Sequence, residues 1–294
     1  MSVLRNSPEN RTLEELLEFG IVNLDKPAGP SAHQVSAWVS DITGVSKAAH
    51  AGTLDPKVTG VLPIMLASAT RIAPVLVDSV KTYVAILELH GDPLTPLDTV
   101  ISQFETVIFQ KPPKKSAVSR QLRTREVYDL CLLDTNADQA LLSISCESGT
   151  YIRKLCHDIG LAAGCGAHMG ELRRVSTGCF DDSELVSTAQ LTDAAVWRDE
   201  AKTEHLERII DPAEIALAPL PGVTIAPSAA ESVATGAPVY APGVMTADKD
   251  AQTAGRTDLL VCYTPSGTAV CLGRRVGSFD SDRGEVVQLE RVLI

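Results

Sequence analysis

Residues 50–62 read His-Ala-Gly-Thr-Leu-Asp-Pro-Lys-Val-Thr-Gly-Val-Leu and place one carboxylate, Asp55, in a short loop. The proline after Asp55 disfavours a helical conformation at that position. Gly52 and Gly60 flank the aspartate and would let the backbone approach another molecule closely. The mostly apolar run of residues 61–67 predicts a buried segment behind the loop. A carboxylate fixed in this way suits nucleophilic or acid–base chemistry, although Asp-Pro is also an ordinary turn dipeptide.

Length and composition predict a cytoplasmic protein. The 294 residues suffice for one large domain and one small one, and 45% of them are hydrophobic, enough for a sizeable core. No run approaches 18 uninterrupted apolar residues, so we expect no membrane span. The first five residues lack the apolar core of a signal peptide.

The seven cysteines are dispersed and form no Cys-x-x-Cys pair, which predicts reduced cytoplasmic thiols. Cys156-His157 has no second Cys/His pair at zinc spacing, so we expect no metal site.

The net charge of −11 and a pI near 5.0 are unusual for a nucleic-acid-binding protein. Either the chain binds no nucleic acid, or its acidic excess lies away from a local basic face. The distribution favours the second, because residues 111–125 carry six basic side chains and no acid, whereas residues 180–215 carry ten acids and three basic residues. The acidity and the scarcity of lysine also suggest, as a hypothesis, a halophile's cytoplasm.

Periodicity predicts an α+β fold with a mixed or antiparallel sheet. A helix is expected from Ser31 to Gly44, with Val35, Trp38, Val39 and Ile42 along one face. Strands are expected at 82–90 and 140–146, and Thr188 is expected to cap a short helix. After Ser148-Gly149-Thr150 a further helix is expected, with an apolar stripe at 152, 155, 156 and 159 and with Arg153 in its first turn.

A boundary is predicted near residues 216–222, where two prolines and a glycine interrupt small residues. The domains would then be residues 1–218 and residues 219–294. The second would be small and β-rich, with a helix at 228–235, an acidic loop at 248–258, a hairpin of 259–263 with 269–273, and a strand at 286–292.

Five segments, in order along the chain, resemble the motifs of the TruB/dyskerin family of RNA pseudouridine synthases. Any one of them alone would be a weak signal, but together they are specific. They are Leu24-Asp25-Lys26-Pro27-Ala28-Gly29-Pro30-Ser31, His50-Ala51-Gly52-Thr53-Leu54-Asp55-Pro56, Lys81-Thr82-Tyr83, Gly149-Thr150-Tyr151-Ile152-Arg153-Lys154-Leu155 and Glu171-Leu172-Arg173-Arg174.

The resemblance implies an isomerase that needs neither metal nor organic cofactor. It implies that Asp55 is the catalytic aspartate, that Tyr83 stacks on the flipped uracil and helps to remove the carbon-5 proton, and that Arg153 pairs with Asp55 to keep it ionised and oriented. On sequence alone, Tyr83 is equally typical of a half-buried strand residue. Arg153 is equally typical of an exposed charge on a helix, although a cation in the first turn opposes the helix dipole.

Five more residues are predicted to bind or position the substrate. The resemblance implies that His50 inserts where the target base was and that Leu172 forms an apolar wall of the uracil pocket. Lys26 would support the Asp55 loop or contact phosphate, and Lys114 and Arg120 would bind RNA from the basic run. Each has a structural alternative: a satisfied histidine, ordinary core packing for the leucine, and solvated surface cations.

The branch that the chain resembles most is the archaeal, dyskerin-type enzyme, on residues 53–60 and 110–123. Such enzymes work with an H/ACA guide RNA and small ribonucleoprotein proteins. Residues 236–244, Gly-Ala-Pro-Val-Tyr-Ala-Pro-Gly-Val, resemble the signature of the PUA RNA-binding domain, a small β-barrel-like module. The expected architecture is therefore an α+β catalytic domain followed by a PUA domain.

Three other functions stay open on sequence grounds. The chain could be a stand-alone synthase that modifies the T-loop uridine of transfer RNA. It could be a non-catalytic RNA-binding scaffold, although a scaffold has no need of Asp55, Tyr83 and Arg153 together. It could also be an acidic hydrolase with Asp55 as nucleophile, which would leave the PUA-like segment unexplained.

Overall fold

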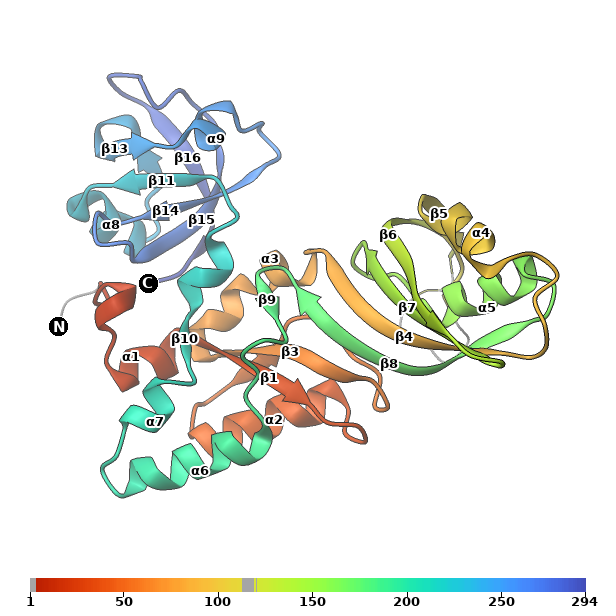
Figure 1. Cartoon of the computed structure of the whole chain (residues 1–294). Coiled ribbons are helices and arrows are strands. Elements are labelled where there is room, and N and C mark those ends of the chain that lie inside the picture. The colour runs from red at the N-terminus through yellow and green to blue at the C-terminus, as the bar shows by residue number, and fades with distance from the viewer. Residues whose placement is uncertain (1–3, 113–118, 120) are drawn as a thin grey trace.

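The structure is a computed structural model that describes residues 4–112, 119 and 121–294. It has two sheets, one of ten strands and one of six, and helices pack on both (Figure 1). The expected α+β class with a mixed sheet and a following β-rich unit is confirmed. In the part of the chain that is described, no helix is long and apolar enough to cross a membrane.

The large sheet places β8 between β3 and β4, and this order builds the cavity described below. β3 and β8 run parallel over a short register, Thr59 opposite Arg173 and Gly60 opposite Arg174, whereas β4 is antiparallel to both β7 and β8. In spatial order the strands are β10 (Asp211–Pro212), β1 (Gly20–Lys26), β3 (Thr59–Leu66), β8 (Ala167–Thr177), β4 (Lys81–Leu89), β7 (Gln139–Cys146), β6 (Arg123–Thr135) and β5 (Val107–Gln110), with β2 (Ala48–His50) on β3 and β9 (Phe180–Asp181) on β8.

Helices lie beside this sheet and come before, between and after its strands along the chain (Figure 1). They are α1 (Leu13–Glu18), α2 (Ala32–Thr43), α3 (Ala73–Val77), α4 (Leu97–Ile101), α5 (Ile152–Ala162), α6 (Thr188–Asp199) and α7 (Glu204–Glu207). Short 3-10 turns are η1 (Pro8–Asn10), η2 (Ala67–Ile72), η3 (Ser102–Phe104) and η4 (Ala213–Leu217).

The helix predicted from Ser31 is confirmed as α2. Ser31 and Gln34 form a reciprocal capping box, and Gly44 ends the helix with φ of 76°. The predicted apolar face is wrong at Trp38, which is 41% exposed, because the buried face is made by smaller residues such as Val35 and Val39.

The helix predicted at Thr188 is confirmed as α6, but its cap is one residue earlier. The side chain of Ser187 accepts a hydrogen bond from the backbone N–H of Gln190, and the Gln190 side chain accepts in turn from the Ser187 N–H. Thr188 is therefore the first helical residue. Ser187 forms the cap because Gln190 stands three residues after it, at the position that a capping box needs, whereas no glutamine or glutamate stands three residues after Thr188.

The two predicted strands and the helix after Gly149 are confirmed. Along β4 the side chains alternate in burial from Lys81 to Leu87, and β7 buries every second residue from Ala140 to Cys146. Arg153 is the second residue of α5, in its first turn as expected.

The six-stranded sheet contains the predicted hairpin, β14 (Leu259–Tyr263) with β15 (Ala269–Arg275). The other strands are β12 (Val239–Tyr240), β16 (Glu285–Val292), β11 (Gly222–Ile225) and β13 (Val244–Ala247), with α8 (Pro227–Ala234) and the 3-10 turn η5 (Ala241–Gly243) beside them. The prediction of an acidic loop at 248–258 is wrong in part, because Asp248 caps a short helix, α9 (Lys249–Thr253), by accepting from the Ala251 N–H.

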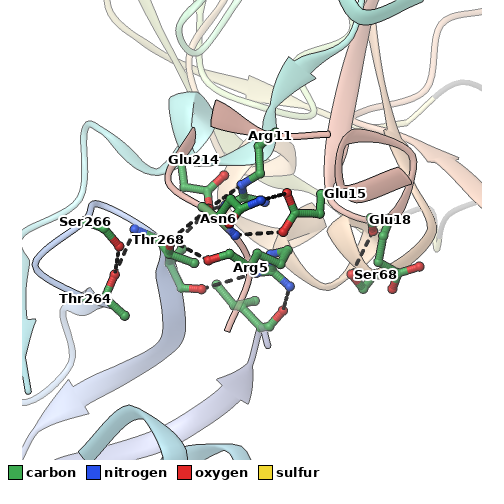
Figure 2. A network of polar contacts seen from close by, with 12 residues as sticks. Arg5, Asn6, Arg11, Glu15, Glu18, Ser68, Glu214, Thr264, Ser266 and Thr268 are labelled. Carbon is green, nitrogen blue, oxygen red and sulfur yellow. Dashed lines mark hydrogen bonds and ion pairs between the residues drawn. The ribbon is translucent and has the colours of Figure 1, made fainter. Parts of the chain in front are cut away.

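The segment of residues 4–12, which we call the N-terminal strap, ties the two sheets together (Figure 2). The Arg5 guanidinium donates to the carbonyl oxygens of Leu293 and Ala269 at 2.9 and 3.3 Å and lies 4.0 Å from the centroid of the Phe19 ring. Arg11 pairs with Glu214 at 2.5 Å, with the two side chains 1% and 7% exposed. A shared apolar cluster continues from β1 and β3 into β14 and β15, so the sheets are joined by both buried apolar surface and buried charge.

Candidate active site

A cavity of about 540 Å³ opens beside the loop that carries Asp55. Its walls come from four segments far apart in sequence: the Asp55 loop (residues 51–58), the start of β4, the loop before α5 and the middle of β8. Asp55, Tyr83, Arg153 and Leu172 all line it. The structure therefore brings together the three predicted catalytic residues and the predicted apolar wall.

Asp55 and Arg153 form an ion pair across the mouth of the cavity. Arg153 Nη2 lies 2.8 Å from Asp55 Oδ2, and the side chains are 40% and 50% exposed. A pair this exposed is worth only about 0–1 kcal/mol of stability. Its value is geometric, because the guanidinium fixes the direction of a carboxylate that remains accessible from the cavity.

Tyr83 lies deeper, on β4, and is buried with 9% exposure. Burial raises the pKa of its hydroxyl, and the positive charge of Arg174 opposes part of that increase. An aromatic ring at the inner end of a cavity is a suitable stacking platform for a flat base.

Lys26 is fully buried beneath the Asp55 loop. Its ammonium donates to the carbonyl oxygens of Pro27, Pro56 and Val58 at 3.0, 3.1 and 2.8 Å. Burial lowers the pKa of Lys26, and Asp55 offsets part of that decrease. Three carbonyl oxygens around a buried ammonium favour the first predicted role, support of the loop, over the phosphate contact.

The glycines beside Asp55 also have a different use from the one expected. Gly60, with φ of 98°, lets β3 contact β8, since a Cβ there would be 2.1 Å from the Arg174 carbonyl oxygen. A Cβ on Gly52, with φ of 89°, would lie 3.3 Å from Arg174 Nη1. Both glycines allow a close approach to the protein's own Arg174.

His50 and Leu172 occupy different positions relative to the cavity. Leu172 lines it from β8, opposite Ala85 of β4. His50 ends β2 and is not among the lining residues; its Nδ1 is buried and has no hydrogen-bond partner among the described residues. Burial lowers the pKa of His50, with Arg174 and His33 adding to the decrease. Lys114 and Arg120 lie outside the described residues.

Two charged cavity residues were not predicted as part of the site: Arg174 and Lys81. Lys81 is 4% exposed and donates to the Leu76, Val77 and Ser79 carbonyls at 3.0, 2.9 and 2.6 Å, which fixes the end of α3 against the cavity. Burial lowers the pKa of Lys81 to about 8, and Arg174 contributes to the decrease. The sequence could have indicated both residues. Lys81 and Arg174 each lie within one of the family motifs, at an inward-facing position of a strand.

The described residues offer no group of three or more His, Cys, Asp or Glu side chains arranged to hold a metal ion. All seven cysteines are free thiols. Burial raises the pKa of Cys156, next to His157, to about 12, which makes it a poor metal ligand.

Three family descriptions match segments of the chain. They are the DKCLD (NUC011) domain over residues 5–36, the TruB family pseudouridylate synthase N-terminal domain over residues 40–96, and the tRNA pseudouridylate synthase B C-terminal domain over residues 153–218.

Relatives and solved structures match nearly the whole chain. The probable tRNA pseudouridine synthase B of Halobacterium salinarum is 59% identical over 99% of both chains, and that of Haloarcula marismortui is 53% identical over 99% of this chain and 94% of its own. A chain in the crystal structure of a Cbf5-Nop10-Gar1 complex has a TM-score of 0.90 at 40% identity and covers 100% of this chain and 91% of its own. A chain in the structure of an H/ACA RNP bound to a substrate RNA containing 2′-deoxyuridine has a TM-score of 0.90 at 38% identity, covering 99% and 90%. The expected resemblance is therefore confirmed, and the chain belongs to the TruB family of pseudouridylate synthases.

Proposed function

We propose that this protein isomerises uridine to pseudouridine in RNA as the catalytic subunit of an H/ACA ribonucleoprotein. The similar solved chains come from a Cbf5-Nop10-Gar1 complex and from an H/ACA RNP bound to substrate RNA, and each is matched over most of its length. The partners would be an H/ACA guide RNA, small proteins of that particle, and a ribosomal or transfer RNA substrate.

One observation carries the catalytic part of the proposal: Arg153 holds the Asp55 carboxylate at 2.8 Å at the mouth of a cavity whose inner wall includes Tyr83. A carboxylate directed at an enclosed space can act on the sugar or the base of a nucleotide turned into it. The cavity walls exclude water from the detached uracil while it turns.

The reaction needs one bond exchange and one proton exchange. The bond from the ribose carbon to uracil N1 breaks, a bond from the same carbon to uracil C5 forms, C5 loses its proton and N1 gains one. We assign the first step to Asp55 and removal of the C5 proton to Tyr83, over whose ring the uracil would stack. Leu172 would hold the other side of the base, and no redox step is involved.

The remaining predicted residues have supporting roles in this proposal. His50, beside the cavity, would occupy the place from which the uridine is withdrawn. Lys26 would keep the Asp55 loop in place, and Lys114 and Arg120 would contact the RNA backbone from the basic run.

The two proposed domains correspond to the two sheets. We propose that residues 1–218 form the catalytic domain and residues 219–294 a PUA RNA-binding domain, in a cytoplasmic protein. The relatives from Halobacterium and Haloarcula agree with the halophilic interpretation of the acidic composition.

A second candidate function, a stand-alone transfer RNA synthase, has its own support. The curated relatives carry the name probable tRNA pseudouridine synthase B. This activity would use the same cavity and residues without a guide RNA.

The test is pseudouridine formation at molar KCl on two labelled substrates: a transfer RNA alone, and a ribosomal RNA fragment with a matching H/ACA guide and the partner proteins. The enzymes would be wild type, Asp55→Ala, Tyr83→Phe and a control, Glu200→Ala, which removes an exposed carboxylate paired with Lys202 at 2.9 Å. RNA binding is measured alongside, because removing one carboxylate should abolish the chemistry and largely spare affinity.

Product only with the guide assembly would support the ribonucleoprotein function, whereas product on transfer RNA alone would favour the stand-alone enzyme. Asp55→Ala should give no product on either substrate, and Glu200→Ala should match wild type. Binding without product from the wild-type protein would leave the scaffold function instead.

A further inference from the structure

Arg174 occupies the one strand that separates the two halves of the cavity. β8 lies between β3, which follows the Asp55 loop, and β4, which carries Tyr83. In register, Arg174 is opposite Gly60 on one side and opposite Tyr83 on the other. Because β8 is the strand between β3 and β4, a side chain at this position on it can contact both the Asp55 loop and Tyr83.

The side chain makes both contacts. Arg174 Nε donates to the Val61 carbonyl oxygen at 2.7 Å, and Nη2 donates to the Gly52 carbonyl oxygen at 3.3 Å, three residues before Asp55. The register also places Arg174 beside Tyr83, both side chains line the cavity, and the guanidinium charge acts on the Tyr83 hydroxyl. Gly52 and Gly60 leave the space that these contacts need.

The charge of Arg174 is buried without a carboxylate. Arg174 is 1% exposed, and none of the ion pairs between described residues includes it. The nearby ammonium of Lys81 is also buried and bound to carbonyl oxygens. A buried, uncompensated cation is costly for folding, so this pair of cations is unfavourable unless negative charge develops beside it.

We propose that Arg174 is a positioning residue for Tyr83: its guanidinium orients the Tyr83 hydroxyl and supplies the positive charge that stabilises the phenolate during removal of the carbon-5 proton. This inference rests on the proposed function, because it assigns a role in the same reaction. Burial raises the pKa of Tyr83, and the Arg174 charge lowers it again.

The step balances without a co-reactant. Tyr83 first releases its hydroxyl proton to solvent, leaving a phenolate beside the guanidinium. After the new ribose–C5 bond has formed, the phenolate oxygen takes the C5 proton, and the C–H electron pair restores the C5–C6 double bond. The N1–C6 π pair then moves to N1, which takes a proton from solvent in place of the one that Tyr83 released. The phenol is then neutral, and Arg174 remains charged throughout.

The experiment is a double-mutant cycle in single-turnover kinetics, with the RNA-bound protein, comparing Arg174→Lys, Tyr83→Phe and the combination. Arg198→Lys is the matched control, because Arg198 also donates from a guanidinium to a backbone carbonyl, that of Thr43 at 2.8 Å, far from the cavity. Arg174→Lys keeps the charge but loses the forked donors, and we expect a rate loss of about ten- to hundredfold. In the Tyr83→Phe background the same change should cost less than about threefold, since its target hydroxyl is gone.

A second variant, Arg174→citrulline, nearly keeps the shape and the Nε donor, removes the charge and exchanges one terminal donor for a carbonyl acceptor, so it tests the charge even where lysine perturbs folding. We expect it to move the rising limb of the pH–rate profile to higher pH, and a fluorinated tyrosine at position 83, which ionises more readily, to restore part of the rate. Losses from Arg174→Lys and Tyr83→Phe that multiply independently, or an unshifted pH profile, would overturn the proposal. An inactive wild-type protein in the same assay would instead overturn the proposed function.

Discussion

Arg11→Met should destabilise the protein far more than the loss of an ordinary surface ion pair. Arg11 and Glu214 are 1% and 7% exposed, and Glu214 Oε1 accepts from both Arg11 Nη2 at 2.5 Å and the Ala269 N–H at 3.2 Å (Figure 2). The substitution leaves the Glu214 carboxylate buried with only the backbone N–H. The strap would then lose its buried ion pair and keep the hydrogen bonds that Arg5 and Asn6 make to the six-stranded sheet and its loops.

The expected magnitude follows from burial. Removing one partner of a buried ion pair costs about 3–5 kcal/mol, and the same applies to Glu214→Leu, which strands the guanidinium. The double variant Arg11→Met/Glu214→Leu removes both charges of the pair and leaves the Ala269 N–H unpaired, which costs about 1–3 kcal/mol. Like Glu214→Leu alone, it also removes the favourable charge of Glu214 from the Arg5 guanidinium. The double variant should therefore be more stable than either single variant, a sign reversal that a simple loss of contacts cannot produce.

The assay is urea unfolding of the three variants and wild type at molar KCl. Lys202→Met is the control, because Lys202 and Glu200 pair at 2.9 Å with 54% and 58% exposure and should contribute less than about 1 kcal/mol. A loss below about 1 kcal/mol for Arg11→Met, or single losses that add in the double variant, would refute the account of the strap as a buried electrostatic link.

Three further outcomes are expected. Lys26→Met should lower the free energy of unfolding by about 1–3 kcal/mol, because the buried Val58 carbonyl loses its donor while the Pro56 carbonyl keeps the Gly29 N–H. It should also lower turnover more than RNA affinity. Urea titration and single-turnover kinetics check both effects, and weakened RNA binding alone would contradict the prediction. Gly60→Ala should lower the free energy of unfolding by at least about 3 kcal/mol. Gly29→Ala, with φ of 115° but open space around it, should lower it by only about 1–2 kcal/mol. Equal losses of stability in thermal or urea unfolding would be inconsistent with the contact between Gly60 and β8. Lys81 has a folded pKa of about 8, below its ordinary value of 10.5, so the unfolded chain binds more protons between those pH values and stability should rise with pH across that window. Urea midpoints should show this rise in wild type and not in Lys81→Met.

Local signals account for most of what the sequence could predict. The Ser31 and Gly44 caps, the alternation along β4 and the apolar stripe of α5 depend on residues within a few positions of one another, and these elements formed where expected. The errors at Thr188 and at 248–258 are equally local. Two candidate caps stand one residue apart at the first position, and a helix of five residues leaves only a weak pattern at the second.

The roles of Lys26 and Arg174 could not be predicted in that way. Whether Lys26 faces RNA or supports a loop depends on the packing of β1 against β3, which follows from pairing over about forty residues of chain. Arg174 depends on β8 lying between β3 and β4, which brings position 174 beside positions 60 and 83. The family motifs predicted that Asp55, Tyr83 and Arg153 lie together without knowledge of the strand order. They did not show that Arg174 is the cation beside Tyr83.

The N-terminal strap has a consequence for how the molecule is assembled. Arg5 binds the carbonyl of Leu293, 288 positions later, and Thr268 donates to the carbonyls of Arg5 and Asn6. During synthesis these contacts can form only after residues 268–293 have left the ribosome, long after Arg5 and Asn6. Because contacts between residues so distant in sequence form slowly, we expect the strap to dock late in folding, and a change that hinders its docking to leave the residues of the catalytic cavity in place.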